Sequence, residues 1–353
     1  MSELMLSRRI FMGTATTGAV ALAAPGLLSS PANAQACPSG QPSAEAIKAA
    51  LKAAHKAYKG VKGGKNADYI PALAEVPSKL FGIALVDADG QIHEAGDSRQ
   101  LFSIQSVSKP FTMALVMQQS GAKLIEDTVG VDATGQAFNS IEAIEQHRGR
   151  EMNPLVNPGA IATVGNVQGA SAEQVWEKII GFYSDCAGRP LEVDQEVYKS
   201  ESATNHRNPA IGALMAAYGR FPMDPAIATD LYTRQCAISV SARDLAVMAA
   251  TLAFGGYNPV TRRRVLDSEH VPGVLAVMAT AGLYDDTGKW LFQCGLPAKS
   301  GVGGGIAAVA PGKFGIAAFS PPLDDAGNSV RGQRAIIDIT RALNANPYAQ
   351  FGM

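Results

Sequence analysis

Short apolar runs bounded by turn residues lie near both ends of the chain. Residues 81–87 precede an Asp89-Gly90 turn and a more polar extended run, a pattern typical of a β-hairpin. Residues 305–310 and 314–319 are two further apolar runs separated by a Pro-Gly turn, which predicts a second hairpin. We expect strands from the two ends of the chain to pair in one antiparallel sheet.

Apolar residues at helical spacing predict helices beside these strands. Ser43 is followed by an apolar stripe that runs from Ile47 through Leu51 to Tyr58, which indicates an amphipathic helix that begins after a serine cap. Residues 334–343 show the same periodicity and predict the helix that closes the chain.

The long middle of the chain has helical character. Its clearest helix is predicted from Ser241 to Phe254, with an S-x-x-D cap at its start and two glycines after its end. Another is predicted with Asn208 as its N-cap and Pro209 at the first helical position. The predicted fold class is therefore α+β: an antiparallel sheet formed by both chain ends, packed helices, and a mostly helical insertion over roughly residues 111–280.

Residues 1–34 have the layout of an export signal. Arg8-Arg9 lie in the stretch Ser-Arg-Arg-Ile-Phe-Met, which resembles the twin-arginine signal. The apolar region that follows is too diluted by glycine and threonine for a transmembrane helix. Small residues at 32–34 suit cleavage before Gln35. We expect residues 35–353 to form a single domain in the periplasm. The chain would be cytoplasmic if the signal were not used, and an uncleaved membrane anchor is the alternative.

The composition narrows the function classes. Of 353 residues, 47% are hydrophobic and 17% are charged, which provides enough apolar material for a large core. Lysine and arginine total 30 against 31 aspartate and glutamate, for a formal net charge of -1. This balance argues against a surface that binds nucleic acid through clustered positive charge. A globular enzyme or a binding protein fits best.

The cysteines do not have the spacing of a zinc site or a dithiol redox motif; they are Cys37, Cys186, Cys236 and Cys294. An oxidising periplasm would allow disulfides, and every complete pairing is open. We expect buried free thiols at Cys236 and Cys294, because both lie in apolar contexts. The five histidines are scattered, so the sequence predicts no metal site and no cofactor.

Ser106 and Lys109 form an S-x-x-K motif at the start of the predicted helix 110–117. Three residues apart on a helix, the two side chains share a face, so the amine can take the hydroxyl proton and activate Ser106 as a nucleophile. The helix N-terminus also presents backbone N–H groups there. The motif is weak alone, because Ser120 and Lys123 have the same spacing at what looks like a helix end.

A second motif strengthens the first. Lys299-Ser300-Gly301 is a K-[ST]-G triplet that precedes an apolar strand. Serine β-lactamases and penicillin-binding proteins combine S-x-x-K with K-T-G on the edge strand of their sheet. The order of the motifs, the strand placement and the helical insertion all fit that architecture.

Longer strings resemble the bacterial and mitochondrial glutaminases of the serine β-lactamase-like superfamily. They are FSIQSVSK from Phe102, NPLVNPGAI from Asn153, the Glu201 to Asn208 spacing, DLYTRQC from Asp230, GLYD from Gly282, GLPAKSGV from Gly295 and ADYIPAL from Ala67. The resemblance covers about residues 60–345 in order. It implies a cofactor-free amidohydrolase that acts on a linear side-chain amide and converts L-glutamine and water to L-glutamate and ammonia through an acyl-enzyme.

The resemblance also implies a role for each motif residue. Ser106 is the nucleophile and Lys109 its activating base. Tyr284 and Tyr232 approach the reacting amide, and either could carry the proton. Backbone N–H groups of Ser106 and Val302 are implied as the oxyanion hole.

A pocket for free glutamine must also meet an ammonium and a carboxylate. Glu201 suits the ammonium, because opposite charges attract strongly where water is excluded. Asn157, Asn208 and Tyr69 can donate hydrogen bonds to the carboxylate. Taken singly, Glu201 fits a solvated loop charge and Asn208 a plain helix cap, and the matched strings favour the binding roles. Ser106, Tyr232, Tyr284 and Val302 complete the expected contacts with substrate.

Two rival functions stay open. A β-lactamase or DD-peptidase would fit the two motifs and a location in the periplasm, whereas Glu201 and the asparagines favour a free amino acid as the substrate. A non-catalytic amino-acid-binding protein is the third class, and an intact Ser106 and Lys109 argue against it. Departures from the family pattern lie at Pro158, residues 131–135 and residues 203–208. The resemblance further implies a homodimer or homotetramer, no nucleic-acid partner and no stable membrane association after signal removal.

Overall fold

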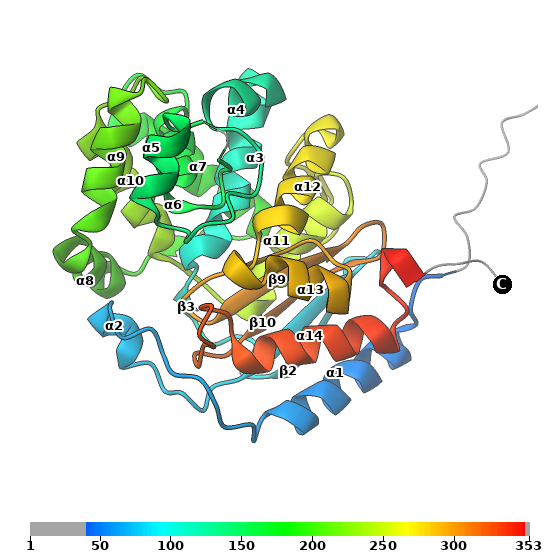
Figure 1. Ribbon diagram of the computed structural model, residues 1–353. Helices are drawn as coiled ribbons and strands as arrows, with labels where there is room; N and C mark the ends of the chain where they lie inside the picture. Colours follow the sequence, from blue (N-terminus) through cyan, green and yellow to red (C-terminus); the bar gives the residue numbers. More distant parts are fainter. Residues whose placement is uncertain (1–39, 151, 350–353) are drawn as a thin grey trace, which may run out of the picture. The chain divides into compact units, whose positions relative to one another are not determined.

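The computed structural model describes residues 40–150 and 152–349 (Figure 1). From Gln41 onward the chain forms one compact unit. The expected export signal, the cleavage position after Ala34 and Cys37 lie outside the described residues. In the part of the chain that is described, no helix has the length and apolar character needed to cross a membrane.

A five-stranded antiparallel sheet is built from both ends of the chain, in the order β2-β1-β10-β9-β8. Its strands are β1 (Gly82–Asp87), β2 (Ile92–Gly96), β8 (Ala298–Ser300), β9 (Gly305–Ala310) and β10 (Phe314–Phe319). Both predicted hairpins are confirmed, and β1 of the first pairs with β10 of the second along its whole length. Lys299 and Ser300 of the K-S-G motif lie on β8, the edge strand of the sheet, as predicted, and Gly301 follows directly after it.

Helices cover both faces of this sheet (Figure 1). On one face lie α1 (Ala44–Tyr58), α13 (Thr287–Cys294) and α14 (Val330–Ala342), and on the other lies α11 (Ala242–Ala253). Alternate side chains of a strand point to opposite faces. Ile83 and Leu85 of β1 therefore pack in the α1 and α14 cluster, while Ala84 and Val86 belong to the α11 cluster.

Serine caps fix the starts of these helices. The hydroxyl of Ser43 accepts from the Ala46 N–H, and Ser241 and Asp244 form a reciprocal capping box at α11, as predicted. The closing helix begins at Val330, four residues before the predicted start, and its cap is Ser329. Val330 is the only large apolar residue of its first turn, Val-Arg-Gly-Gln, so periodicity alone misses this turn.

Glycine lets α11 approach the sheet closely. At Gly315 of β10 an added Cβ would lie 2.0 Å from the Ala250 nitrogen and 2.5 Å from the Ala246 oxygen. Both are backbone atoms of α11, which cannot swing aside as a side chain can. The helix backbone rests directly on this strand.

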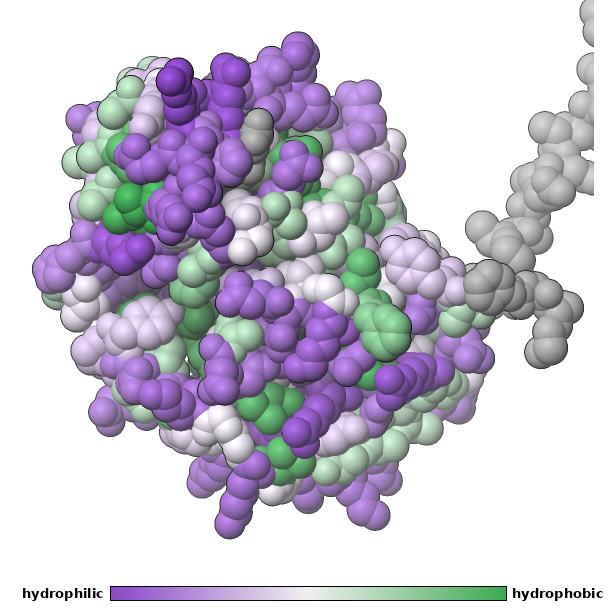
Figure 2. All heavy atoms as spheres, viewed as in Figure 1, coloured by the Kyte–Doolittle hydropathy of each residue, from purple (hydrophilic) through white to green (hydrophobic). Residues whose placement is uncertain are grey.

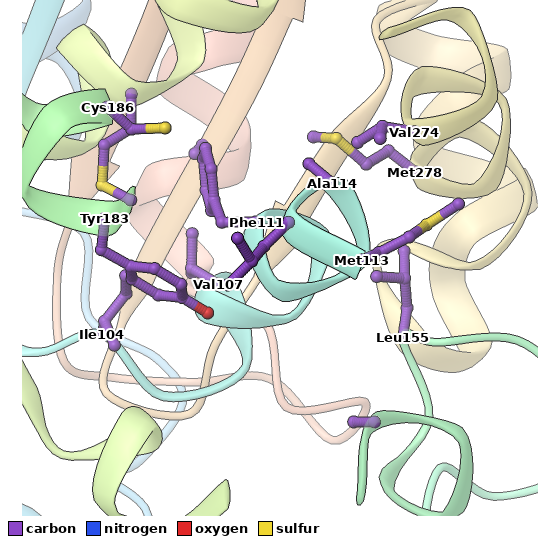
Figure 3. Packing of buried hydrophobic residues seen from close by; sticks show 14 of the residues in the cluster. Ile104, Val107, Phe111, Met113, Ala114, Leu155, Tyr183, Cys186, Val274 and Met278 are labelled. Atoms are coloured by element: carbon purple, nitrogen blue, oxygen red, sulfur yellow. The ribbon is translucent and has the colours of Figure 1, made fainter. Parts of the chain in front are cut away.

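The middle of the chain forms the helical lobe at the top of Figure 1. Its helices are α3 (Lys109–Ser120), α4 (Ala122–Thr128), α5 (Ile141–His147), α6 (Asn157–Gly165), α7 (Ala172–Ala187), α8 (Gln195–Thr204), α9 (Arg207–Ala217), α10 (Pro225–Cys236) and α12 (Val271–Ala281). Helix α3 runs through its core, where Phe111 and Met113 belong to one cluster with Tyr183 of α7 and Met278 of α12 (Figure 3).

The remaining elements are short. They are α2 (Pro71–Ala74), β3 (Phe102–Ser103), β4 (Glu192–Val193), β5 (Ile238–Val240), β6 (Tyr257–Asn258), β7 (Arg263–Arg264) and the 3₁₀ turns η1 (Gln105–Ser108), η2 (Ser268–His270), η3 (Tyr284–Asp286) and η4 (Pro347–Ala349). The face seen in Figure 2 is mostly hydrophilic, with hydrophobic residues in small groups.

The prediction that Asn208 caps a helix is wrong. Helix α9 begins at Arg207, so Asn208 already lies inside its first turn. The backbone N–H of Asn208 donates a hydrogen bond to the side-chain oxygen of Asn205, at 3.2 Å. The Asn208 side chain points instead toward Asn157.

The three described cysteines are free and buried: Cys186, Cys236 and Cys294. The prediction for Cys236 and Cys294 is thus confirmed. Burial raises the pKa of Cys236 to about 12 and that of Cys294 to about 11. Both thiols therefore stay protonated at neutral pH.

Candidate active site

One cavity of about 270 Å³ brings together all eight residues that the sequence predicts as substrate contacts. They are Tyr69, Ser106, Asn157, Glu201, Asn208, Tyr232, Tyr284 and Val302. They come from η1, η3, α6, α8, α9, α10, the segment before α2 and the turn after β8. The volume suits a single small molecule.

Ser106 lies in η1, directly before α3, and is 7% exposed. The Tyr284 hydroxyl is within hydrogen-bonding reach of its side chain. Gly301 of the K-S-G motif comes so close that an added Cβ would lie 2.9 Å from the Ile104 oxygen and 3.2 Å from the Ser106 nitrogen. Glycine is needed there so that the strand motif and the nucleophile can share one wall of the cavity.

Val302 follows this glycine at the cavity wall. Its backbone N–H donates to no other group of the described residues. A donor without a protein partner beside Ser106 is what an oxyanion hole requires.

Lys109 is buried behind the cavity, with 1% of its surface exposed. Within the described part of the chain its ammonium donates to Asn157 Oδ1, at 2.7 Å, and to the Leu155 carbonyl, at 3.4 Å, rather than to Ser106. Burial lowers the pKa of Lys109 to about 8, and the negative charge of Glu201 opposes this shift. A substantial share of this amine is neutral in mildly alkaline water and able to accept a proton.

The second S-x-x-K match, at Ser120 and Lys123, lies at a helix end, as predicted: α3 ends at Ser120, and the exposed Lys123 pairs with Asp127.

Asn157 joins the base to two other site residues. Its Oδ1 accepts from the Tyr232 hydroxyl at 3.1 Å as well as from Lys109. Its Nδ2 donates to Asn208 Oδ1 at 3.1 Å. Pro158 is accommodated because it lies in the first turn of α6, where no intrahelical N–H is needed.

Glu201 is a buried carboxylate, 6% exposed, on α8. Gln105 Nε2 donates to its Oε2 at 3.1 Å. Burial raises the pKa of Glu201 to about 7, while the Gln105 hydrogen bond and the charge of Lys109 work against this rise. A cation bound beside Glu201 would favour its charged form.

Gln105 and Tyr284 hold the left-handed backbone conformation, with φ of 50° and 52°. Such values are uncommon outside glycine and often mark functional sites. Below the Tyr284 ring, at 4.2 Å from its centroid, lies the ammonium of Lys299. It donates to the carbonyls of Gly282, at 2.8 Å, and Ser300, at 2.7 Å. Lys299 is fully buried and does not line the cavity, so it supports Tyr284 from behind.

Burial and the nearby positive charge of Lys109 lower the pKa of Lys299 well below its usual value. The middle residue of the motif, Ser300, donates its hydroxyl to Asn328 Oδ1 at 2.5 Å. The motif therefore has two buried side chains that hold the strand end and a glycine that meets Ser106.

Half of the cavity wall lies outside the predicted substrate contacts, although part of it falls in residues 203–208, where the sequence departs from the family pattern. The additional lining residues are Ile70, Gln105, Phe138, Asn139, Thr204, Asn205, His206 and Arg207. Gln105 lies within a matched string and could have been singled out as the residue before the nucleophile. Phe138 comes from an irregular loop without periodicity, so no local pattern places it at the site. In the described residues, no three histidine, cysteine or acidic side chains gather in a way that could hold a metal ion.

The comparisons with known proteins agree with one another. Residues 64–348 match the sequence profile of the family described as Glutaminase. The chain is 52% identical to a glutaminase of Colwellia psychrerythraea over 86% of this chain and 98% of the relative. It is 49% identical to Glutaminase 2 of Yersinia pestis over 87% and 90%.

Solved structures show the same likeness. The probable glutaminase ybaS superposes with a TM-score of 0.86 at 44% identity, covering 87% of this chain and 99% of that one. A probable glutaminase from Bacillus subtilis, complexed with 6-diazo-5-oxo-L-norleucine, superposes with a TM-score of 0.76 at 27% identity, over 85% and 95%. The expected α+β, serine β-lactamase-like fold is thus confirmed.

Proposed function

Because this chain belongs to the glutaminase family, we propose that it hydrolyses L-glutamine to L-glutamate and ammonia with Ser106 as the nucleophile. The observation that carries the assignment of residues is the composition of the cavity wall. It places the hydroxyl of Ser106 and the carboxylate of Glu201 around one space of about 270 Å³, with the Lys109 amine buried directly behind it.

The first step forms an ester. Ser106 Oγ attacks the side-chain amide carbon of glutamine, and its proton passes to the neutral amine of Lys109. The negative charge on the amide oxygen is met by the backbone N–H groups of Ser106 and Val302. The C–N bond then breaks, and the departing nitrogen takes a proton and leaves as ammonia.

The second step returns the enzyme. Water attacks the glutamyl ester, loses a proton to the base, and releases glutamate as Ser106 recovers its hydrogen. Tyr284 is the better placed of the two tyrosines to pass protons, because its hydroxyl reaches Ser106. The Tyr232 hydroxyl donates to Asn157 Oδ1 at 3.1 Å, whereas the Tyr284 hydroxyl donates at the longer distance of 3.4 Å to the Ser300 carbonyl.

Recognition of the amino-acid end follows from charge. The ammonium of glutamine pairs with Glu201, whose burial makes an opposite charge strongly favourable. Asn157, Asn208 and Tyr69 face the same cavity and provide donors for the carboxylate. Tyr69 is 57% exposed and stands at the rim.

Ammonia release from purified residues 35–353 tests the proposal, with L-glutamine, L-asparagine and D-glutamine given separately. We expect turnover of L-glutamine and a loss of about 10⁴-fold or more in kcat for Ser106→Ala, since loss of a nucleophile removes the covalent route. Full activity of Ser106→Ala would contradict the assignment of Ser106 as the nucleophile. Covalent labelling of Ser106 by a fluorescent penicillin, without glutamine turnover, would favour the β-lactamase or DD-peptidase alternative.

Export is a separate proposal, which rests on the sequence of residues 1–34. Arg8-Arg9 would direct the chain to the twin-arginine route, and cleavage after Ala34 would release it into the periplasm. Fractionation of cells that express the full chain tests this, with a double Arg8→Lys, Arg9→Lys variant as control. We expect the variant to stay in the cytoplasm with an uncleaved N-terminus.

A homodimer or homotetramer is proposed from the family resemblance alone. Light scattering of the purified chain gives the mass in solution. A mass of 36.8 kDa for the full chain would mean a monomer and would contradict the proposal.

A further inference from the structure

A second cavity, of about 320 Å³, adjoins the substrate cavity. Among the described residues that line them, the two share only Phe138 and Tyr284. The rings of these two residues lie 5.0 Å apart at an angle of 49°. One aromatic pair is therefore the partition between the two spaces.

The second cavity is nearly uncharged. Among its described lining residues only Asp285 carries a charge, and the others include Thr134, Leu155, Thr280 and Gly288. Such a wall offers little to a zwitterionic amino acid but lets a small neutral molecule pass.

A third cavity, of about 560 Å³, has a different character. It shares Tyr69, Phe138 and Val302 with the substrate cavity and is also lined by Lys65, Asp68, Asp324 and Asp325. Charged, hydrated walls suit the passage of glutamine and glutamate. We therefore take this side as the mouth for the amino acid.

Ammonia is made at the far end of the substrate from its ammonium and carboxylate. Glu201 and Asn208 meet the amino-acid end, whereas Tyr284 stands beside Ser106, where the C–N bond breaks. The space of about 270 Å³ is still occupied by the glutamyl group when ammonia is released. The direct way out is then past Tyr284.

We propose that the second cavity is the passage by which ammonia leaves the acyl-enzyme and by which small amines can reach it. This inference rests on the proposed function and extends it with a site for a small neutral amine. The Phe138–Tyr284 pair is the gate of this passage.

The backbone on both sides of the gate is anchored. The Phe138 carbonyl accepts from the Asn157 N–H at 2.7 Å, and the neighbouring Asn139 carbonyl accepts from Arg207 Nε at 2.8 Å. On the other side, the Thr287 hydroxyl donates to the Tyr284 carbonyl at 2.7 Å. Opening then requires the turn of a ring, a fast side-chain motion, rather than the displacement of a loop.

Amine nucleophiles provide a readout that hydrolysis alone does not. Hydroxylamine, close to ammonia in size, attacks the glutamyl ester: a C–N bond forms, the ester C–O bond to Ser106 breaks, and the proton lost by nitrogen returns to Ser106 Oγ. The products are γ-glutamyl hydroxamate and free enzyme. The ratio of hydroxamate to glutamate measures access of the amine to the acyl-enzyme.

The test narrows the second cavity at a helical glycine. Gly288 lies in α13 and faces open space, and its φ is not left-handed, so Gly288→Trp adds a side chain there without backbone strain. We expect the hydroxamate-to-glutamate ratio to fall at least about threefold. Gly181→Trp is the matched control, because Gly181 is also an exposed helical glycine with open space around it but lines none of the three cavities. Its ratio should equal that of the wild type.

Further variants separate the outcomes. Thr280→Trp narrows the same cavity from α12 and repeats the test if Gly288→Trp fails to fold. Phe138→Ala removes half of the gate and should raise the share of acyl-enzyme that reacts with methylamine, which is larger than hydroxylamine.

An unchanged hydroxamate-to-glutamate ratio in both Gly288→Trp and Thr280→Trp overturns the passage. A ratio that falls only in Ala326→Trp, a variant that narrows the charged mouth, also overturns it. Release of glutamate by the wild type without hydroxylamine checks the proposed function independently.

Discussion

The side-chain oxygen of Asn157 accepts a hydrogen bond of 2.7 Å from the buried Lys109 ammonium. The contact is between a neutral amide and a cation, so it orients the amine without adding a negative charge that would hold the proton on it. A base that must release and take up a proton near neutral pH needs this kind of partner.

Replacing this amide by a carboxylate should therefore weaken the base. In Asn157→Asp a negative charge next to Lys109 raises the pKa of the amine from about 8, by about one unit or more. The alkaline-rising limb of kcat/KM for glutamine should move to higher pH by the same amount. Asn208→Asp, one hydrogen bond further away, is the control and should move the limb less. Identical limbs in wild type and Asn157→Asp would contradict the role given to Lys109.

The wild-type pH profile follows from two buried groups. Below its pKa of about 7 Glu201 takes up a proton and loses its attraction for the substrate ammonium. Below its pKa of about 8 Lys109 is protonated and cannot accept the Ser106 proton. The pH dependence of kcat/KM reports the groups of the free enzyme. Because both groups work in their deprotonated forms, kcat/KM should rise from pH 6 to pH 9. In Glu201→Gln the loss should appear mainly in KM. A profile that falls across this range would be inconsistent with both assignments.

Lys299 gives a prediction about stability. Lys299→Met removes the shorter of two hydrogen bonds to each of two buried carbonyls, of Gly282 and Ser300, and leaves them only the longer bonds from the Ser300 N–H at 3.2 Å and the Tyr284 hydroxyl at 3.4 Å. We expect the free energy of unfolding to drop by about 2–4 kcal/mol in a urea titration. Lys299→Met should also lower kcat, because the Tyr284 ring loses its support. Lys289→Met, which breaks an exposed pair with Asp286, should stay within about 0.5 kcal/mol of the wild type.

The close contact of α11 with the sheet gives a second prediction about stability. Gly315→Ala places a methyl group 2.0 Å from a backbone nitrogen of α11, so helix and strand must separate. Overpacking of this kind costs about 1–3 kcal/mol or more. Gly181→Ala in α7, where nothing obstructs the methyl group, should instead stabilise the protein by about 0.5–1 kcal/mol. Equal unfolding midpoints for the two variants would show that the sheet yields easily at Gly315.

Much of the fold was predictable because its signals are local. The hairpins at residues 81–96 and 305–319 and the caps at Ser43 and Ser241 depend on neighbours in sequence. The start of α14 was not predictable from periodicity, because Val330 is the only large apolar residue of its first turn. Asn208 was misjudged as a cap because an asparagine before proline is a local cap signal, whereas its partner Asn157 lies on another helix.

The candidate site divides in the same way. The eight contacts could be predicted because each lies in a string that matches the family pattern, and the fold brings all of them to one cavity; their individual roles stay predictions. Gln105 and Glu201 meet across the fold, and Phe138 reaches Tyr284 from a loop. Long-range contacts such as these depend on how the helices pack, and no spacing along the chain encodes them.

The buried cysteines have a consequence for where the chain can mature. Cys186, Cys236 and Cys294 are unpaired thiols shielded from solvent, and burial raises the pKa of each. The described fold thus contains no disulfide among these three cysteines, and its formation requires neither an oxidant nor a disulfide isomerase. A twin-arginine route, which moves folded cargo, would receive a domain that the reducing cytosol had already completed.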